Sequence, residues 1–588
     1  MQEFLLHFYY ACSTIHNKQL KMKGNSMKSK WEYYKIDEKK VKEIQEKYNV
    51  NSLLATILAN REIEDIKTYL EPTRHDFHNP YQMPDMEKAV ERILRAIKNK
   101  EKIIIYGDYD VDGITSITVL KSFFKDLNTE VGEYIPNRLN EGYGLNKEAI
   151  KKIATHGYNL MITVDCGITG IEEIDYAKSL GVETIVTDHH EPGQHLPNAI
   201  AVVDCKRKDN QYPFRELAGV GVAFKLCQAI SQKLYLDEKQ YLKYLDIVAL
   251  GTISDIVPLK DENRVITKLG LMLIKQTQNY GLIALLNLAG YRRIDSTAIS
   301  FGVAPRINAC GRMGFANEAL DLLLSTNPRD ALQKAKNIAK YNNDRQEYEK
   351  IIYNEAIKQI EENKLQAKNS IVLGGNGWHH GVVGIVASKI TDLYYKPCLL
   401  ICYENGEDIG KGSGRSIAGF DLHEALTECE DILHGFGGHS MAVGLSINRE
   451  NLPRLKEKFE ELAKMAHLEE TAPTINIDSV LNIDNVNKEM IESLSLLEPL
   501  GEANKMPIFA FKNLKIDSIR SLTEGKHLKL ILRSNNNTFV NAIGFNLGYM
   551  VDEFVIGDKV DVAGCLEINS FNGTDNVQIN LKDIMKSI

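Results

Sequence analysis

The stretch Ile103-Ile104-Ile105-Tyr106-Gly107-Asp108-Tyr109-Asp110-Val111-Asp112-Gly113 is the most informative part of this chain. Its apolar beginning is typical of a buried strand. Three aspartates at alternate positions follow directly, and such crowding of negative charge is costly unless a cation lies among the carboxylates. The stretch therefore predicts a divalent-metal site at the end of a buried strand.

Strand-like runs alternate with helical stretches in the hundred residues that begin at Lys102. This alternation predicts a parallel, doubly wound sheet with helices on its faces. The expected strands are Lys102–Tyr106, Glu130–Ile135, Leu160–Val164, Glu183–Thr187 and Ala199–Val203. The expected helices between them are Gly113–Phe124, Lys147–Thr155 and Ile171–Leu180.

More candidate metal ligands follow other elements of this region. Asp165 ends one strand-like run, Asp188-His189-His190 ends the next, and Asp255 follows a helix. Because ligands of open α/β sheets bind at the carboxyl ends of the strands, we expect these groups to meet. A single aspartate after a strand is commonly a helix N-cap, a role that would also suit Asp112. The coincidence of several such ends instead favours a site for one or two Mg²⁺ or Mn²⁺ ions.

The 588 residues are too many for one hydrophobic core. We expect an α/β protein in which a parallel-sheet domain is joined by a long charged helix, Pro328–Leu365, to a smaller α/β domain. Strand-like runs near the C-terminus, separated by Asn/Gly turns, predict a β-barrel of the oligonucleotide-binding (OB) kind. The expected boundaries are 1–26 for an N-terminal extension, 27–100 for a helical segment, 101–326, 327–368 for the connector, 369–468 and 469–588.

Composition indicates the cellular compartment of the protein and bears on its partners. The nine cysteines are scattered without a C-x-x-C pair, which indicates the reducing cytoplasm. No segment approaches the ~20 apolar residues of a membrane span. The short apolar patch near the start would make a poor signal peptide, and Met27 looks like a natural start. The net charge of −8 argues only weakly against a polyanion as partner.

Several motifs resemble a known superfamily. Asp108–Gly113 together with Asp188-His189-His190 resembles the DHH phosphoesterases, which are named for that triplet. The resemblance to their RecJ branch, the single-stranded-DNA exonucleases, runs from about residue 30 to the end. Many superfamily members have a histidine where this chain has Tyr106, and Asp108 is an additional acid. The further motifs, in the same order as in the RecJ branch, are 134–145, 163–168, 251–259, 305–309, 377–385 and 435–440.

The site residues are assigned with this resemblance in view. The expected metal ligands are Asp110, Asp112, Asp165, His189 and Asp255, with Asp165 bridging two ions. Asp108 either binds a metal or supports the ligands. The resemblance implies that His190 contacts the scissile phosphate, and Asp188 would orient a neighbouring histidine. The expected catalytic set is Asp110, Asp112, Asp165, His189, His190 and Asp255.

Other residues are candidates for contacting the substrate. In the first lobe they are Arg306, Asn308 and Arg312, with a capping or salt-bridge role as the alternative. In the second lobe the glycine-rich runs could be simple turns, but the resemblance implies that this lobe grips the substrate, through His380, Arg415 and His439. The Trp378-His379-His380 run would either stack on a base or fill the contact between lobes. Lys526, His527, Lys529 and Arg533 could share one face of a barrel strand and contact single-stranded DNA, with a solvated edge strand as the alternative.

The function implied by the resemblance is metal-dependent 5′→3′ hydrolysis of single-stranded DNA to 5′-mononucleotides in recombination and repair. A narrow passage between two lobes would admit one strand and exclude a duplex. Single-strand-binding protein and a helicase are candidate partners, and a monomer is expected. Two alternatives stay open: a phosphodiesterase for short oligoribonucleotides or cyclic dinucleotides, and a noncatalytic replication scaffold. A scaffold would have lost its carboxylates, whereas this chain has them all.

Overall fold

The computed structural model describes residues 29–404, 406–468, 473–571 and 574–587. They form two compact units. One holds the described residues of three ranges: those up to Ile66, those of Tyr348–Leu496 and those of Met506–Ile588. The other, which contains the metal-site candidates, holds Lys67–Glu347 and Leu497–Lys505. The extension predicted for residues 1–26 lies outside the described residues.

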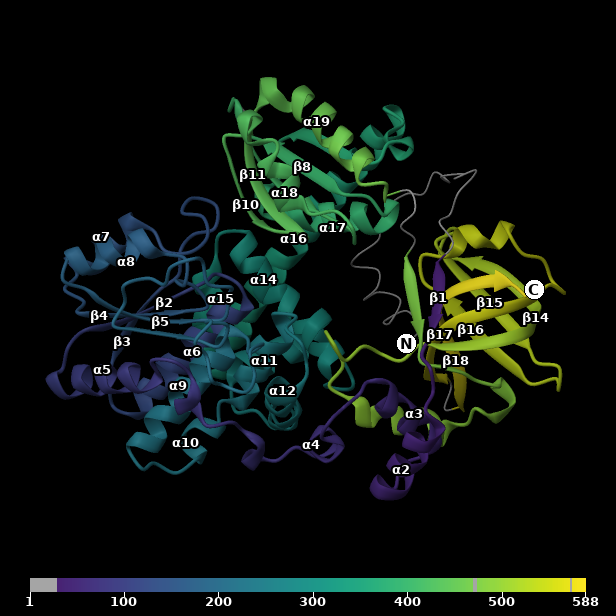
Figure 1. The fold of residues 1–588 in the computed structure, drawn as a ribbon, viewed down its shortest axis with the longest axis horizontal. Helices are drawn as coiled ribbons and strands as arrows, with labels where there is room; N and C mark the ends of the chain where they lie inside the picture. The colour runs from purple at the N-terminus through teal and green to yellow at the C-terminus, as the bar shows by residue number, and fades with distance from the viewer. Residues whose placement is uncertain (1–28, 405, 469–472, 572–573, 588) are drawn as a thin grey trace. The chain divides into compact units, whose positions relative to one another are not determined.

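The predicted parallel sheet is confirmed. Five parallel strands follow the order β3-β2-β4-β5-β6. In β2, Ile103 and Ile105 pack into one core cluster with α5, α6 and α9, whereas Ile104 and Tyr106 pack into another with α7. This alternation covers both faces of the sheet with helices (Figure 1). The bounds are β2 Ile103–Gly107, β3 Val131–Tyr134, β4 Leu160–Val164, β5 Glu183–Asp188, β6 Ala201–Asp204, α5 Met86–Asn99, α6 Val111–Asp126, α7 Lys147–Thr155, α8 Ile171–Ser179 and α9 Gly219–Lys233.

Helices complete this unit, and the last of them leads out of it. The helix α16, Pro328–Glu362, is the predicted connector. Its first half contributes Ala331, Ala335 and Ile338 to the core of the sheet domain, and its second half contributes Ile352 and Ala356 to a different core. The other bounds are α4 Ile66–Leu70, α10 Lys239–Leu242, α11 Leu245–Ser254, α12 Asp261–Ile274, α13 Tyr280–Ala289, α14 Ala304–Arg312 and α15 Ala316–Leu323.

The second α/β domain is built on a mixed sheet of order β10-β11-β9-β8-β7. Only β7 and β8 are parallel, and the rest of the sheet is antiparallel. Helix α17 packs on the face that carries Leu373, Cys398 and Leu400, while α19 belongs to the core on the other face. The bounds are β7 Ile371–Asn376, β8 Cys398–Tyr403, β9 Ile409–Arg415, β10 Gly435–His439, β11 Ala442–Asn448, α17 His380–Tyr394, α18 Leu422–Thr427 and α19 Leu452–Met465.

The C-terminal strands form the predicted barrel. The sheet order β13-β14-β15-β16-β18-β17 is closed by pairing of β14 with β17. Register shifts after Phe511 and Ile516 interrupt the alternation of the long strand β14. The bounds are β13 Ser479–Val480, β14 Phe509–Leu522, β15 His527–Arg533, β16 Phe539–Gly544, β17 Lys559–Phe571 and β18 Thr574–Lys586, with α20 Lys488–Ser493 before β14.

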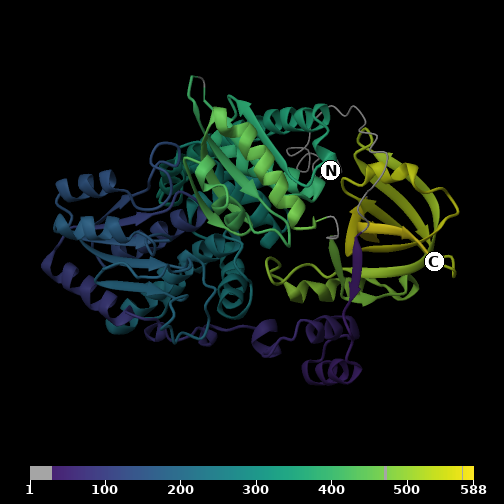
Figure 2. The ribbon, with the colours of Figure 1, turned by 45° about the horizontal axis from the view of Figure 1, so that its top comes forward.

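The N-terminal segment was expected to be helical, and it does contain α2, Glu38–Tyr48, and α3, Ser52–Asn60. It also contains a strand, β1 Lys30–Tyr33, which pairs in parallel with β12 Thr474–Ile477 beside the barrel (Figure 2). Trp31 fixes this strand by donating from Nε1 to Asp583, 2.8 Å away. Sequence spacing could not predict the pairing, because it joins segments that lie far apart along the chain. Among the described residues, no helix is both long and apolar enough to cross a membrane.

Candidate metal centre

The first aspartate cluster follows β2 and begins α6. Asp110 is the N-cap of α6, because its Oδ1 accepts hydrogen bonds from the backbone N–H groups of Asp112 and Gly113 at 2.9 and 3.2 Å. Asp112 does not cap its own helix. Its two oxygens accept from the N–H groups of Gly219 and Val220 at 2.6 and 2.8 Å, at the start of α9. The helix N-terminus therefore fixes the orientation of Asp112 and favours its ionised form.

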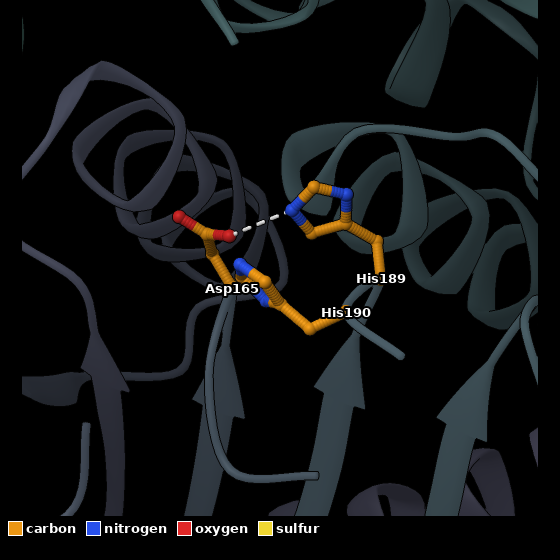
Figure 3. A group of neighbouring side chains, drawn as sticks. All are labelled: Asp165, His189 and His190. Atoms are coloured by element: carbon orange, nitrogen blue, oxygen red, sulfur yellow. Dashed lines mark hydrogen bonds and ion pairs between the residues drawn. The ribbon is translucent and has the colours of Figure 1, made fainter. Parts of the chain in front are cut away.

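Asp165 and His189 come from neighbouring strand ends and meet above the sheet (Figure 3). Nε2 of His189 lies 3.1 Å from Oδ1 of Asp165 and 3.7 Å from carboxylate oxygens of both Asp112 and Asp255. Asp165 itself has a left-handed backbone, with φ of 57°. Aspartate tolerates this conformation better than most residues, and such backbone is common at functional sites.

The grouped ligand atoms define overlapping metal-sized sites. Three sets of side chains bring carboxylate or imidazole atoms within 4.8 Å of one another. Asp165 belongs to two of these sets, one with the first motif and one with the histidines, which is the position expected for a bridging ligand. The sets are Asp108, Asp110 and Asp165; Asp165, His189 and His190; and Asp112, His189 and Asp255.

Burial and mutual repulsion disfavour the charged forms of four of the aspartates. Burial, followed by the charges of neighbouring aspartates, raises the pKa of Asp112 to about 7 and holds the pKa of Asp108, Asp165 and Asp255 well above the ordinary value. Burial lowers the pKa of His189 to about 3, so its ring is neutral and able to donate a lone pair. A divalent cation would remove the repulsion and favour the ionised carboxylates.

Two buried carboxylate oxygens also indicate that a cation binds here. Oδ1 of Asp108 and Oδ2 of Asp255 have no hydrogen-bond partner among the described residues. Buried acceptors without a partner are rare in folded proteins because desolvation is then uncompensated. The donor set of carboxylate oxygens and a neutral imidazole suits Mn²⁺ or Mg²⁺. The residues therefore fit one or two such ions.

Asp188 orients the second histidine of the triplet. Its Oδ1 accepts from Nδ1 of His190 at 2.7 Å, and its Oδ2 accepts from the N–H of Ile168 at 2.9 Å. Burial alone would lower the pKa of His190, but the hydrogen bond and charge of Asp188 together with nearby aspartates raise it above 6.5. The ring of His190 is thus held as a proton donor, with the hydroxyl of Tyr143 3.3 Å from its Nε2.

Tyr106 occupies the position where many DHH proteins have histidine, and it is a core residue. Its ring is fully buried and stacks on Tyr134 at 5.2 Å. Its hydroxyl donates to the carbonyl of Gly144 and accepts from Asn146. These contacts anchor the 134–146 loop to β2, so Tyr106 supports the site without being a ligand.

The comparisons with known proteins agree with this geometry. Three family models match the chain: "DHH family, N-terminal domain" over residues 102–252, "DHHA1 domain" over 366–465 and "RecJ OB domain" over 477–583. The single-stranded-DNA-specific exonuclease RecJ of Bacillus subtilis is 39% identical over 95% of this chain and 71% of its own length. This chain belongs to the RecJ family. The predicted family and fold class are both confirmed.

Solved structures of RecJ proteins share the whole fold. A crystal structure of RecJ from Thermus thermophilus in complex with Mn²⁺ covers 96% of this chain and 80% of its own, with a TM-score of 0.83 and 29% identity. A second, with Mg²⁺, covers 95% of this chain and 79% of its own, with a TM-score of 0.77 and 28% identity. These two metals are the ones predicted from the ligand types of this RecJ-family chain.

Helix α14 carries the substrate candidates of the catalytic lobe. Asn308 lies against the first motif, where its Oδ1 accepts from the N–H of Val111 at 3.2 Å. Arg306 donates to the backbone carbonyls of Gly302 and Leu288, the latter at 3.4 Å. Asn308 is therefore beside the metal centre of this RecJ-family protein, whereas these contacts of Arg306 are structural. A role for Arg306, Asn308 and Arg312 in binding substrate stays a prediction.

Sequence reasoning missed one basic side chain near the metal centre. Cζ of Arg138 lies 5.0 Å from the ring centroid of Tyr109, the residue between the first two aspartates of the motif. The positive charge of Arg138 opposes the rise that burial causes in the pKa of Asp108. The sequence did contain a signal for this residue, because Arg138 lies in the 134–145 motif that resembles the RecJ branch. A cation at this place is suited to a phosphate.

In the DHHA1 domain, two candidates align across three strands. Arg415 of β9 and His439 of β10 both pair with Ala442 of the intervening β11. Directly opposed residues project from the same face of a sheet, so these two side chains share a face. His380 is the first residue of α17, next to the capping residue His379. Binding of substrate by His380, Arg415 and His439 stays a prediction.

Base stacking, one of the two alternatives for the Trp378-His379-His380 run, is wrong for Trp378. Its ring is buried within the core of the DHHA1 domain, and its Nε1 donates to Glu355 of α16 at 2.6 Å. It is therefore unavailable to stack on a base.

In the OB barrel, Lys529 and Arg533 do share the half-exposed face of β15, but His527 is buried and accepts from the N–H of Asn546.

Proposed function

We propose that this chain is a metal-dependent exonuclease that hydrolyses single-stranded DNA. The observation that carries the proposal is the convergence of Asp112, Asp165 and Asp255 on His189, in overlapping and largely buried sets of potential ligands. Membership of the RecJ family supports the substrate, because relatives are named single-stranded-DNA-specific exonucleases. An intact set of acids also argues against a noncatalytic scaffold.

The residues have distinct roles in this proposal. Asp108, Asp110, Asp112, Asp165, His189 and Asp255 would hold the metal, which lowers the pKa of bound water and neutralises charge on the phosphate. Asp110 and Asp112 are oriented by backbone amides, so little reorganisation is needed on binding. His190, held by Asp188, would donate a hydrogen bond to the scissile phosphate. Arg138 would place a further positive charge at the edge of the site.

The finer features of the proposal come from the family resemblance. They are 5′→3′ polarity, release of 5′-mononucleotides, and a role in recombination and repair in the cytoplasm. Action as a monomer with single-strand-binding protein and a helicase as partners belongs to the same proposal. The described cysteines are all buried and free, which suits a reducing compartment.

The test is hydrolysis of end-labelled oligonucleotides with Mn²⁺ or Mg²⁺. We expect 5′-labelled single-stranded DNA to release labelled mononucleotide first, with duplex DNA and a cyclic dinucleotide resistant. Early release from the 3′ label would contradict the polarity, and preferred cleavage of the cyclic dinucleotide would contradict the substrate class. Asp110→Ala should abolish turnover with folding retained, whereas Asp175→Ala, at an exposed position of α8, should leave it unchanged.

A further inference from the structure

The loop that carries Asp255 contains a strained residue. Asp255 ends α11, and Ile256, the next residue, has a left-handed φ of 63°. A β-branched residue in this conformation is a genuine outlier and is strained. The side chain of Ile256 is 70% exposed, so its own packing does not compensate for this. Contacts elsewhere must therefore hold the loop in place.

Those contacts come from a segment far along the chain. Leu497–Lys505 lies in the same compact unit as the metal centre, although it connects α20 to the first long strand of the OB barrel. The carbonyl of Glu502 accepts from the N–H of Leu259 at 2.9 Å. Gly501 lies so close to Leu259 that a Cβ added to it would be 2.6 Å from Leu259 Cδ1. The segment thus fixes the far end of the strained loop.

The segment is in turn held by two buried polar side chains. Arg264 donates to the carbonyls of Tyr69, Leu497 and Glu498 at 2.7, 3.1 and 3.1 Å, and its guanidinium lies 3.4 Å from the ring centroid of Tyr69. Asn504 accepts from the Tyr69 hydroxyl at 2.7 Å and donates to the carbonyls of Leu497 and Pro499 at 2.8 and 2.6 Å.

Both side chains are almost fully buried, at 2% exposure each. A buried network whose members are all bonded is rigid, and removal of one member leaves the others unsatisfied. The geometry of Leu497–Lys505 therefore depends on Arg264 and Asn504, and the geometry of the loop after Asp255 depends on Leu497–Lys505.

We propose that Leu497–Lys505 is a brace that holds the Asp255 loop in its metal-binding geometry, with Asn504 and Arg264 as its positioning residues. The metal affinity of the catalytic domain then depends on a segment that belongs in sequence to the C-terminal part of the chain. The inference rests on the proposed role of Asp255 as a ligand. Outer residues that orient ligands typically contribute about 10–100-fold to metal affinity.

The test compares full-length Asn504→Ala with wild type in two measurements. Hydrogen exchange of the metal-free proteins should show faster exchange in the peptide that contains Ile256 and Leu259. Mn²⁺ binding, followed through the electron paramagnetic resonance of free Mn²⁺, should weaken about tenfold. Turnover should recover at saturating Mn²⁺, because the variant changes the occupancy of the metal site and not the hydrolysis step. Unchanged exchange, or unchanged Mn²⁺ affinity, would overturn the proposal.

Two further variants keep the result interpretable. If Asn504→Ala fails to fold, Tyr69→Phe takes its place in the test. This variant removes one hydrogen bond to Asn504 and should show the same faster exchange and weaker Mn²⁺ binding to a smaller degree. Lys505→Ala removes an exposed ion pair with Glu502 in the same segment and should behave as wild type. Loss of Mn²⁺ affinity in Lys505→Ala as large as in Tyr69→Phe would overturn the assignment of the effect to Asn504.

Relief of the strain provides an independent test. Asparagine adopts left-handed backbone readily, so Ile256→Asn in the Asn504→Ala background should restore Mn²⁺ affinity. Failure to restore it would overturn the link between strain and brace. Asp255→Asn separates this inference from the assignment of Asp255 as a metal ligand. Unchanged Mn²⁺ affinity in Asp255→Asn would refute that assignment. A loss of Mn²⁺ affinity in Asp255→Asn without a loss in Asn504→Ala would refute only the brace.

Discussion

Oδ1 of Asp165 lies 3.1 Å from Nε2 of His189, although the two residues end different strands. Both side chains are buried, and two more carboxylates lie within 3.7 Å of the same imidazole nitrogen. Without a cation such a cluster is electrostatically unfavourable, because burial raises the pKa of every acid in it. The arrangement is that of a binding site whose ligand supplies the missing positive charge.

Asp165→Asn should separate metal binding from folding. The substitution keeps the shape and tolerates the left-handed backbone, but it removes the shared carboxylate charge. We expect turnover on single-stranded DNA to fall about 1000-fold or more, because the metal would then stabilise the charge of the transition state by several kcal/mol less. The rise in melting temperature caused by Mn²⁺ should shrink in parallel. Retained turnover would refute the bridging role, and Asp175→Asn serves as the control.

Metal affinity should depend on pH below neutrality. In the metal-free protein the pKa of Asp112 is raised to about 7, so below pH 7 the metal must displace a proton. Mn²⁺ affinity should therefore decrease as the pH falls from 7 to 6, by up to about tenfold per proton displaced. Calorimetric titrations at pH 6, 7 and 8 measure this directly, and equal affinities at all three would contradict it.

The start of α9 should tolerate no side chain where it faces the acids. A Cβ on Gly219 would lie 2.7 Å from Cβ of Asp165 and 3.0 Å from Oδ2 of Asp112. Gly219→Ala should thus displace both carboxylates and reduce turnover and Mn²⁺ affinity at least about tenfold. Gly221→Ala, in the same helix, meets its nearest neighbour at 3.3 Å and is the matched control. Equal effects of the two variants would contradict the close approach.

A second titrating pair, away from the metal centre, should affect stability. The hydrogen bond to Asp261, 2.7 Å away, raises the pKa of His78 above 6.5. Since the folded pKa is the higher one, this pair stabilises the fold fully below pH 6.5, and its contribution is lost as the pH rises through the folded pKa. Asp261→Asn should therefore lower the free energy of unfolding at pH 5.5 but change it little at pH 8.5. Urea unfolding at both pH values checks this, and an equal loss at both would contradict it.

Periodicity was sufficient to predict the catalytic sheet. Runs such as Leu160–Val164 and Lys147–Thr155 were assigned with their observed bounds, because uninterrupted apolar strands and capped amphipathic helices carry strong local signals. The meeting of Asp165 and His189 also followed, because the ends of parallel strands share one edge of the sheet. These predictions used only local patterns and one rule of topology.

Other features depend on contacts that local patterns do not contain. Asp112 was considered as a cap of its own helix, but it binds the first turn of α9, which lies far along the sequence. Trp378 was a candidate for base stacking, yet it completes a core. The parallel pairing of β1 with β12 and the contact of Glu502 with Leu259 join distant segments. Each is set by tertiary packing, which overrides local propensity.

The most direct test of the metal centre is an anomalous difference map from a crystal of this protein soaked in Mn²⁺. We predict manganese peaks enclosed by Asp112, Asp165, His189 and Asp255, and absent from crystals of Asp165→Asn grown in the same way. Manganese bound elsewhere on the chain, with these four side chains surrounded only by water, would contradict the central claim.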